Sequence, residues 1–155
     1  MNTVLKASLI LIAIASGSLA EEGHVHDKIV PGPKGGRLLE VTSGHAEFYV
    51  EKDKKISVTF YDPEMKPAAP GEQMVKVIAE APAGRTALDF EKAGDALVSS
   101  RPLPEGDGYR IVVQIRPTAD AKPQNFRIDY HDEMCGECKL AEYACVCSDH
   151  KSHEH

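Results

Sequence analysis

The chain has 155 residues, of which 18 are Lys or Arg and 24 are Asp or Glu, so its formal net charge at pH 7 is −6. The basic residues are scattered and form no stripe interleaved with aromatic side chains, which argues against nucleic-acid binding. Hydrophobic residues make up 42% of the chain and no long polar tract interrupts them, which favours a folded domain over disorder.

The first 20 residues have the pattern of a secretory signal peptide. A single lysine, Lys6, precedes a short apolar run at residues 9–15, and the small residues Ser18 and Ala20 then provide a cleavage site. The apolar run is much shorter than the roughly 18 residues that a membrane-spanning helix requires. We therefore expect cleavage after Ala20, export to the periplasm or the exterior, and no membrane span in the mature chain.

Residues 21–35 are expected to form a flexible arm. Prolines and glycines are frequent in this segment, and they disfavour regular secondary structure. The segment also contains His24 and His26, followed by Asp27. Imidazole binds zinc, copper and nickel well, so His24 and His26 are candidate metal ligands.

Residues 36–130 are predicted to form a β-domain, because short segments alternate apolar and polar residues with a period of two. In the segment "HAEFYV", for example, Ala46 and Phe48 share the face expected to be buried, whereas Glu47 belongs to the face expected to be exposed to solvent. The predicted strands are residues 37–41, 45–50, 55–61, 74–79, 86–90, 96–99, 109–116 and 125–130.

The connections between these segments are rich in turn-forming residues, and no segment keeps a helical apolar period over three turns. Three prolines in residues 62–72 exclude a central strand there. Seven or eight short strands in this arrangement predict an all-β fold, a small antiparallel β-sandwich. The absence of tryptophan and of cysteines in the strands excludes the disulfide-centred core of antibody domains.

Residues 131–155 form a Cys/His-rich tail that holds all four cysteines of the chain. Their spacing is C-x2-C-x6-C-x-C, at Cys135, Cys138, Cys145 and Cys147. Four thiolates on two short chelating loops could bind one zinc ion, and the same soft donors suit copper(I). In an oxidising compartment, four cysteines are also consistent with two disulfides or with a redox-active pair. The spacing leaves these three alternatives open.

Histidines beside the cysteines strengthen the case for a metal site. The candidates near the cysteines are His131, His150, His153 and His155, the last three in the segment "HKSHEH". Cysteine and histidine close together in a short tract are typical of metal binding. Tyr143 and Leu140 are the sizeable apolar residues between the two cysteine pairs, so any docking of the tail on the β-domain is expected to use them.

The segment "GPKGGRLLE…HAEFYV" resembles the start of a small periplasmic β-domain found in front of the adaptor subunits of heavy-metal efflux pumps of the resistance-nodulation-division type. The tail pattern "CxxCxxxxYxCxC" looks similar to that of small exported bacterial proteins. The resemblance covers residues 30–147. It implies a periplasmic location, a link to metal handling and membrane efflux components as partners, and it implies no catalytic residue. The chain shows no lipoyl-type domain or coiled-coil hairpin, so a role in bridging a pump to an outer-membrane channel is not expected.

Common catalytic motifs are missing from the sequence, which contains no G-x-S-x-G, no H-E-x-x-H and no phosphate-binding glycine loop. We therefore expect a protein that is not an enzyme. The main hypothesis is an exported metal-binding protein whose Cys/His tail holds zinc or copper, with a role in metal efflux or homeostasis. The alternative is a structural or interaction domain whose tail contains two disulfides.

Overall fold

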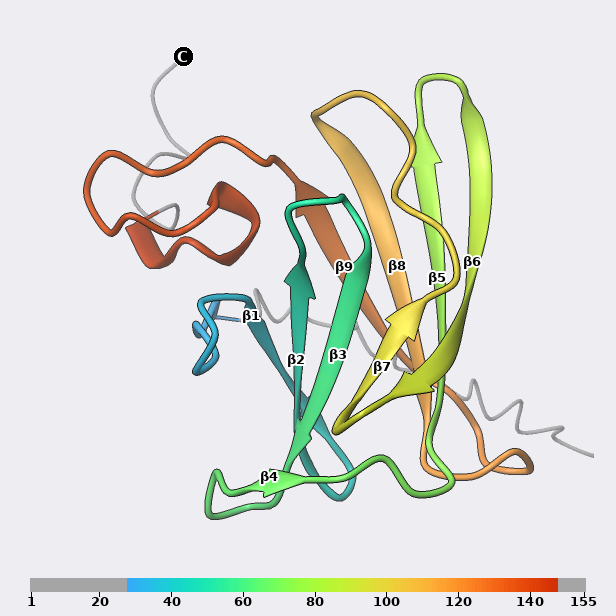
Figure 1. Ribbon diagram of the computed structural model, residues 1–155. Helices are drawn as coiled ribbons and strands as arrows, with labels where there is room; N and C mark the ends of the chain where they lie inside the picture. Colours follow the sequence, from blue (N-terminus) through green and yellow to red (C-terminus); the bar gives the residue numbers. More distant parts are fainter. Residues whose placement is uncertain (1–27, 148–155) are drawn as a thin grey trace, which may run out of the picture.

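The computed structural model describes residues 28–147, and this part of the chain is built almost entirely from β-strands (Figure 1). Each of the eight predicted segments overlaps a strand. The additional strand, β4, has two residues and pairs with the end of β3. The described residues contain no helix that is long and apolar enough to cross a membrane. The elements are β1 (Arg37–Val41), β2 (Gly44–Val50), β3 (Ile56–Tyr61), β4 (Pro67–Ala68), β5 (Met74–Ala81), β6 (Gly84–Ala93), β7 (Ala96–Ser99), β8 (Tyr109–Arg116), β9 (Gln124–Tyr130) and the short 3-10 helix η1 (Glu142–Ala144).

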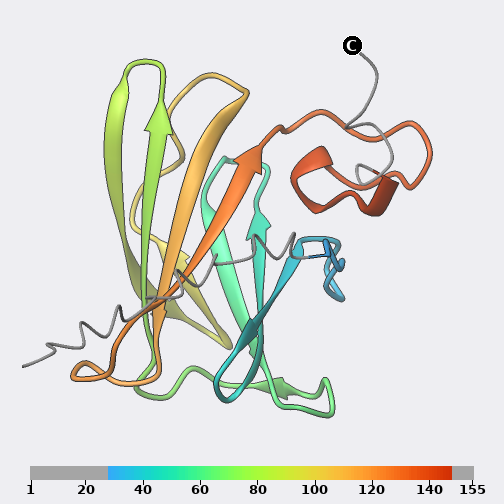
Figure 2. The ribbon, with the colours of Figure 1, turned by 180° about the vertical axis from the view of Figure 1, so that it is seen from behind.

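Neighbouring strands pair antiparallel in the order β1-β2-β3-β7-β6-β5-β8-β9. Strand β6 belongs to both layers, because residues 84–89 pair with β5 and residues 90–93 pair with β7. The sheet therefore folds over along β6, and its two halves face each other (Figures 1 and 2). The predicted all-β antiparallel sandwich is confirmed, with one strand shared between the two layers.

The core lies between the two layers and is built from the apolar faces of their strands. The pattern is clearest in β8, where Ile111, Val113 and Ile115 are buried and the residues between them are not. Burial of a large apolar side chain contributes about 1.5–3 kcal/mol, so the core residues supply most of the stability. The largest fully buried apolar side chains include Phe48, Ile56, Leu88, Ile111, Ile115, Ile128 and Tyr130.

The face of β2 that was expected to be exposed carries a buried carboxylate. Glu47 is fully buried because the turn at residues 31–36 folds over it. Its Oε1 accepts hydrogen bonds from the backbone N–H groups of Lys34 (2.8 Å) and Gly36 (2.9 Å), and its Oε2 accepts one from the Tyr61 hydroxyl (2.8 Å). Burial and the neighbouring Glu47 raise the pKa of Tyr61. The expectation of solvent exposure was wrong for Glu47, because the turn supplies the donors that water would otherwise provide.

The two outer strands of the folded sheet, β1 and β9, are not paired with each other. At one end of the opening between them, the backbone N–H and the hydroxyl of Thr42 both donate to Oε1 of Gln124 at 2.8 Å. At the other end lie residues 131–147, the part of the tail that the structure describes (Figure 1). The fold therefore places the tail against the open side of the sandwich.

Candidate metal centre

The tail continues from β9 as a small hairpin. Its tip is the turn that carries Cys135 and Cys138, closed by a hydrogen bond of 3.1 Å from the backbone N–H of Lys139 to the carbonyl of Cys135. Helix η1 then returns the chain so that the second cysteine pair lies beside the first. Three backbone hydrogen bonds join the two arms: Cys135 N–H to Leu140 O (2.8 Å), Glu142 N–H to Glu133 O (2.9 Å) and Tyr143 N–H to His131 O (3.2 Å).

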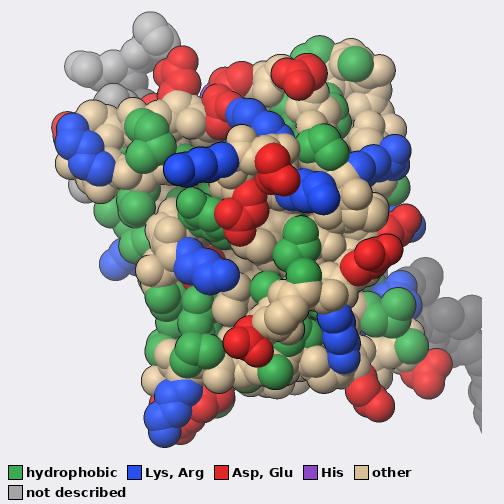
Figure 3. Space-filling view, viewed as in Figure 1, with side chains coloured by type: hydrophobic (Ala, Val, Ile, Leu, Met, Phe, Trp, Pro, Cys, Tyr) green, Lys and Arg blue, Asp and Glu red, His purple; other side chains and the backbone are tan. Residues whose placement is uncertain are grey.

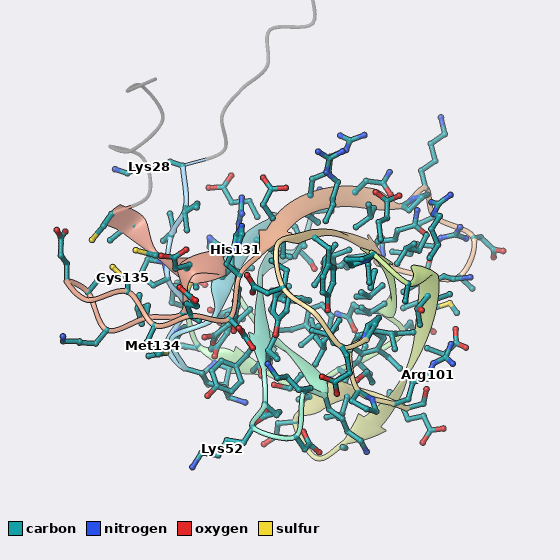
Figure 4. The ribbon with its side chains drawn as sticks, turned by 90° about the horizontal axis from the view of Figure 1, so that it is seen from above. Lys28, Lys52, Arg101, His131, Met134 and Cys135 are labelled. Atoms are coloured by element: carbon teal, nitrogen blue, oxygen red, sulfur yellow. The ribbon has the colours of Figure 1, made fainter. Side chains whose placement is uncertain are left out.

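The four cysteine sulfurs form one cluster. Their Sγ atoms all lie within 4.8 Å of one another, those of Cys138 and Cys145 are 3.2 Å apart, and no disulfide joins any of the four. Four sulfurs at about 2.3 Å from one zinc ion would lie about 3.8 Å from each other, so the cluster has the size of a single tetrahedral site. Cys145 is buried and the other three are half-buried. Figure 4 shows Cys135 at the outer end of the tail, away from the sheets.

Backbone N–H groups favour the thiolate form of Cys135. Hydrogen bonds from the N–H groups of Cys138 and Glu137 lower the pKa of its thiol to about 6. The pKa of Cys147 is raised to about 12 by desolvation and by its contacts with the other thiols. The backbone N–H of Cys147 donates to Sγ of Cys145 at 3.3 Å. The Cys135 thiol therefore ionises easily, whereas the Cys147 thiol requires a nearby positive charge in order to ionise. A bound metal ion would supply such a charge.

Tyr143 anchors the tail to the β-domain. Its side chain is only 4% exposed, and its ring centroid lies 5.8 Å from that of Phe48, edge to face, and 5.8 Å from that of Tyr130. Its hydroxyl accepts a hydrogen bond of 3.0 Å from the backbone N–H of Val50. Of the two residues expected to dock the tail, Tyr143 has this role, and Leu140 is only half-buried.

His131 lies outside the four-cysteine group and pairs with a carboxylate. Its Nδ1 is 2.9 Å from Oδ2 of Asp107, whose Oδ1 accepts a hydrogen bond of 2.9 Å from the backbone N–H of Asp132. These two contacts, the one from Asp132 first, lower the pKa of Asp107. Figure 4 shows His131 closer to the sheets than Cys135. The structure thus brings the four predicted cysteines together, while His131 has a different partner.

The remaining predicted ligands lie outside the described residues, and their role stays a prediction. They are His24, His26, His150, His153 and His155. The sequence analysis did not single out Met134, which is 65% exposed and directly precedes Cys135 in the chain. Its position next to the first cysteine was the available signal.

The surroundings of the cluster are acidic. The exposed carboxylates of Glu133, Glu137 and Glu142 belong to the tail, and Lys139 is the one basic residue among residues 132–147. Such an excess of negative charge attracts cations. On the face of the molecule seen in Figure 3, acidic and basic side chains are interspersed, so this face offers no basic stripe for a nucleic-acid backbone.

Comparison with protein-family models, curated proteins and solved structures gave no match to this chain. The function is therefore inferred from the cysteine cluster, its surroundings and the sequence.

Proposed function

We propose that this protein is an exported, non-catalytic metal-binding protein whose four cysteines hold one transition-metal ion. The observation that carries the proposal is the sulfur cluster, in which all four Sγ atoms lie within 4.8 Å of one another. Backbone N–H donors to the sulfurs of Cys135 and Cys145 support it, because they stabilise thiolates, the form of cysteine that binds metal.

Zinc is the first choice of metal. A closed set of four cysteine ligands, which leaves no position for water, is typical of structural zinc sites. Copper(I) is the second choice, because thiolates are soft donors that suit this ion. In either case the four cysteines are the residues that would hold the ion.

We further propose a role in metal homeostasis or efflux outside the cytoplasm. Three features support it: the signal-peptide pattern of residues 1–20, the resemblance to the β-domain of efflux adaptors, and five histidines in residues 21–27 and 148–155. Histidines in these two segments would collect metal ions that the cysteines then retain. Membrane efflux components are the partners that this role implies.

Two disulfides are the alternative chemistry for the same cluster. The Sγ atoms of Cys138 and Cys145 are 3.2 Å apart, so a small side-chain movement would bring them to the length of about 2.05 Å of an S–S bond. Cys135 and Cys147 would then form the second bridge. The tail would be a covalently closed structural element that binds no metal through its cysteines.

Elemental and mass analysis decides between the two chemistries. The chain is exported to a periplasm, purified without chelator and examined under native and denaturing conditions. Metal binding predicts about one equivalent of zinc or copper per chain and a denatured mass with four reduced cysteines. No metal, and a denatured mass lower by four hydrogens, would replace the proposal with the disulfide alternative.

Two variants assign the ligands. Cys138→Ser leaves three sulfur donors, so we expect it to lose most of the bound metal. Deletion of residues 148–155 removes three histidines and keeps all four cysteines, so the metal content should stay at about one equivalent. Equal metal content in the wild type and in Cys138→Ser would contradict a four-thiolate site.

A further inference from the structure

One side chain of the tail contacts both sides of the opening in the sandwich. The far end of this opening is held by the hydrogen bonds from Thr42 to Gln124. At the near end, the Tyr143 ring lies between Phe48 of β2 and Tyr130 of β9, with its centroid 5.8 Å from each of theirs. Tyr143 therefore fills the near end of the opening, where no strand pairing joins β9 to β1 or β2.

Tyr143 also completes a hydrogen bond that strand pairing leaves unmade. Strand β1 begins at Arg37, which lies opposite Phe48 of β2, so Val50 lies beyond the end of β1. The backbone N–H of Val50 donates to the Tyr143 hydroxyl at 3.0 Å instead. A half-buried N–H that loses its partner is costly, so the hydroxyl and the ring both favour the seated position of Tyr143.

The loop that carries Tyr143 is flanked by two cysteines of the cluster. Tyr143 lies between Cys138 and Cys145, whose Sγ atoms are 3.2 Å apart, and Cys145 is itself buried. The intervening element, η1, has three residues and no side-chain cap. Helical segments this short are not stable by themselves. An ion bound by the four sulfurs would close the loop at both ends and fix Tyr143 between them.

We propose that metal occupancy of the cysteine cluster controls the closure of the β-domain. The bound ion holds Tyr143 at the near end of the opening between β1 and β9, against Phe48 and Tyr130, and loss of the ion lets Tyr143 leave. The inference rests on the proposed metal binding. Because coupling between two sites is reciprocal, the seated Tyr143 must raise the metal affinity by the same factor. Tyr143 is thus a positioning residue for the metal site.

Zinc affinity measures this reciprocal effect. It is determined by competition with a colorimetric chelator for the wild-type chain, Tyr143→Ala and Tyr143→Phe. Alanine removes both ring contacts, so we expect the affinity to fall by about 5- to 150-fold, the usual range for such couplings. Phenylalanine keeps the ring and should lose less. The control is Leu88→Ala, which removes a fully buried side chain of β6 and should leave the zinc affinity of the folded protein unchanged.

A second measurement uses only the wild type, and so it decides the matter even if Tyr143→Ala does not fold. Hydrogen exchange of the Val50 amide is followed in the zinc-loaded and the zinc-depleted protein. We expect exchange to become at least about tenfold faster after zinc removal, because the Tyr143 hydroxyl no longer accepts its hydrogen bond. The amide of Val113, in the central part of β8, should exchange equally slowly in both forms.

The results separate the two proposals. If the wild-type chain takes up no metal, the proposed function fails and the coupling fails with it. If zinc binds but Tyr143→Ala keeps an affinity within about twofold of the wild type, the coupling alone is overturned. The same holds if the Val50 amide exchanges at one rate with and without zinc.

Discussion

A substitution at Glu47 tests how a buried charge stabilises this fold. Its carboxylate is fully buried and accepts three hydrogen bonds of 2.8 to 2.9 Å, from the N–H groups of Lys34 and Gly36 and from the Tyr61 hydroxyl. A buried charge is costly unless such donors compensate for lost water. Glutamine has nearly the same shape and no charge. Glu47→Gln therefore tests whether the negative charge holds the turn at residues 31–36 on the sheet.

The size of the effect follows from the three hydrogen bonds. A hydrogen bond to a charged group contributes about 1.5–3 kcal/mol, and one between neutral groups about 0.5–1.5 kcal/mol. Glutamine can keep its carbonyl on the two backbone N–H groups, and the Tyr61 hydroxyl can turn to accept from the amide. Each bond then weakens by about 1 kcal/mol, while relief of the buried charge offsets part of the sum. We expect a net loss of about 2 kcal/mol in the free energy of unfolding, and about 4 kcal/mol for Glu47→Ala, which leaves the donors unpaired.

Urea unfolding at pH 7 measures this loss. With a slope of about 1–3 kcal/mol/M, Glu47→Gln should lower the midpoint by about 1 M and leave the slope unchanged. The matched control is Glu40→Gln, because Glu40 is an exposed glutamate on the neighbouring strand β1 and should unfold like the wild type. A Glu47→Gln chain as stable as the wild type would refute the reasoning, since the charge would then contribute nothing to holding the turn.

Three other changes test separate contacts. Tyr143→Phe removes the acceptor of the Val50 N–H and should lower the free energy of unfolding by about 1–3 kcal/mol in urea titrations. Gly36→Ala would place a Cβ against the carbonyl oxygen of Phe48 and should lower the melting temperature by several degrees; an unchanged value would contradict the close approach. The pKa of Asp107 is lowered, so its ionised form stabilises the fold at neutral pH and this contribution is lost as the pH falls through the lowered pKa. Urea titrations should therefore show Asp107→Asn to be less stable than the wild type at pH 7 and equally stable in acid below that pKa.

The strands could be predicted because side-chain alternation is a local property. In β8, Ile111, Val113 and Ile115 alternate with less buried residues, and their burial follows the period of two. Strand β4 could not be predicted from this alternation, since a strand of two residues cannot show a period of two. Its position fits the prolines around it, because β4 pairs only with the end of β3 and is no central strand.

Contacts between segments far apart in the chain could not be predicted in this way. The period of two assigned Glu47 to the solvent face. Such a local pattern carries no information about the turn at residues 31–36, which covers this face. Cysteine spacing left open whether the four sulfurs form one site or two pairs, and the structure brings them together in one cluster. The sequence named Tyr143 only as an apolar residue available for docking. The space that Tyr143 fills exists because β1 and β9 do not pair, and this depends on the order of all the strands in the sheet.

The aromatic contacts around Tyr143 give the molecule an optical signal of its own. Three of its five tyrosines form a row in which Tyr130 contacts the other two. The ring centroids are 5.1 Å apart for Tyr109 and Tyr130 and 5.8 Å apart for Tyr130 and Tyr143. The chain has no tryptophan, so tyrosines dominate its near-ultraviolet circular dichroism. Such a signal requires fixed packing of the rings and vanishes when the packing is lost. The unlabelled protein can therefore report the state of its own tail during a simple titration in a cuvette.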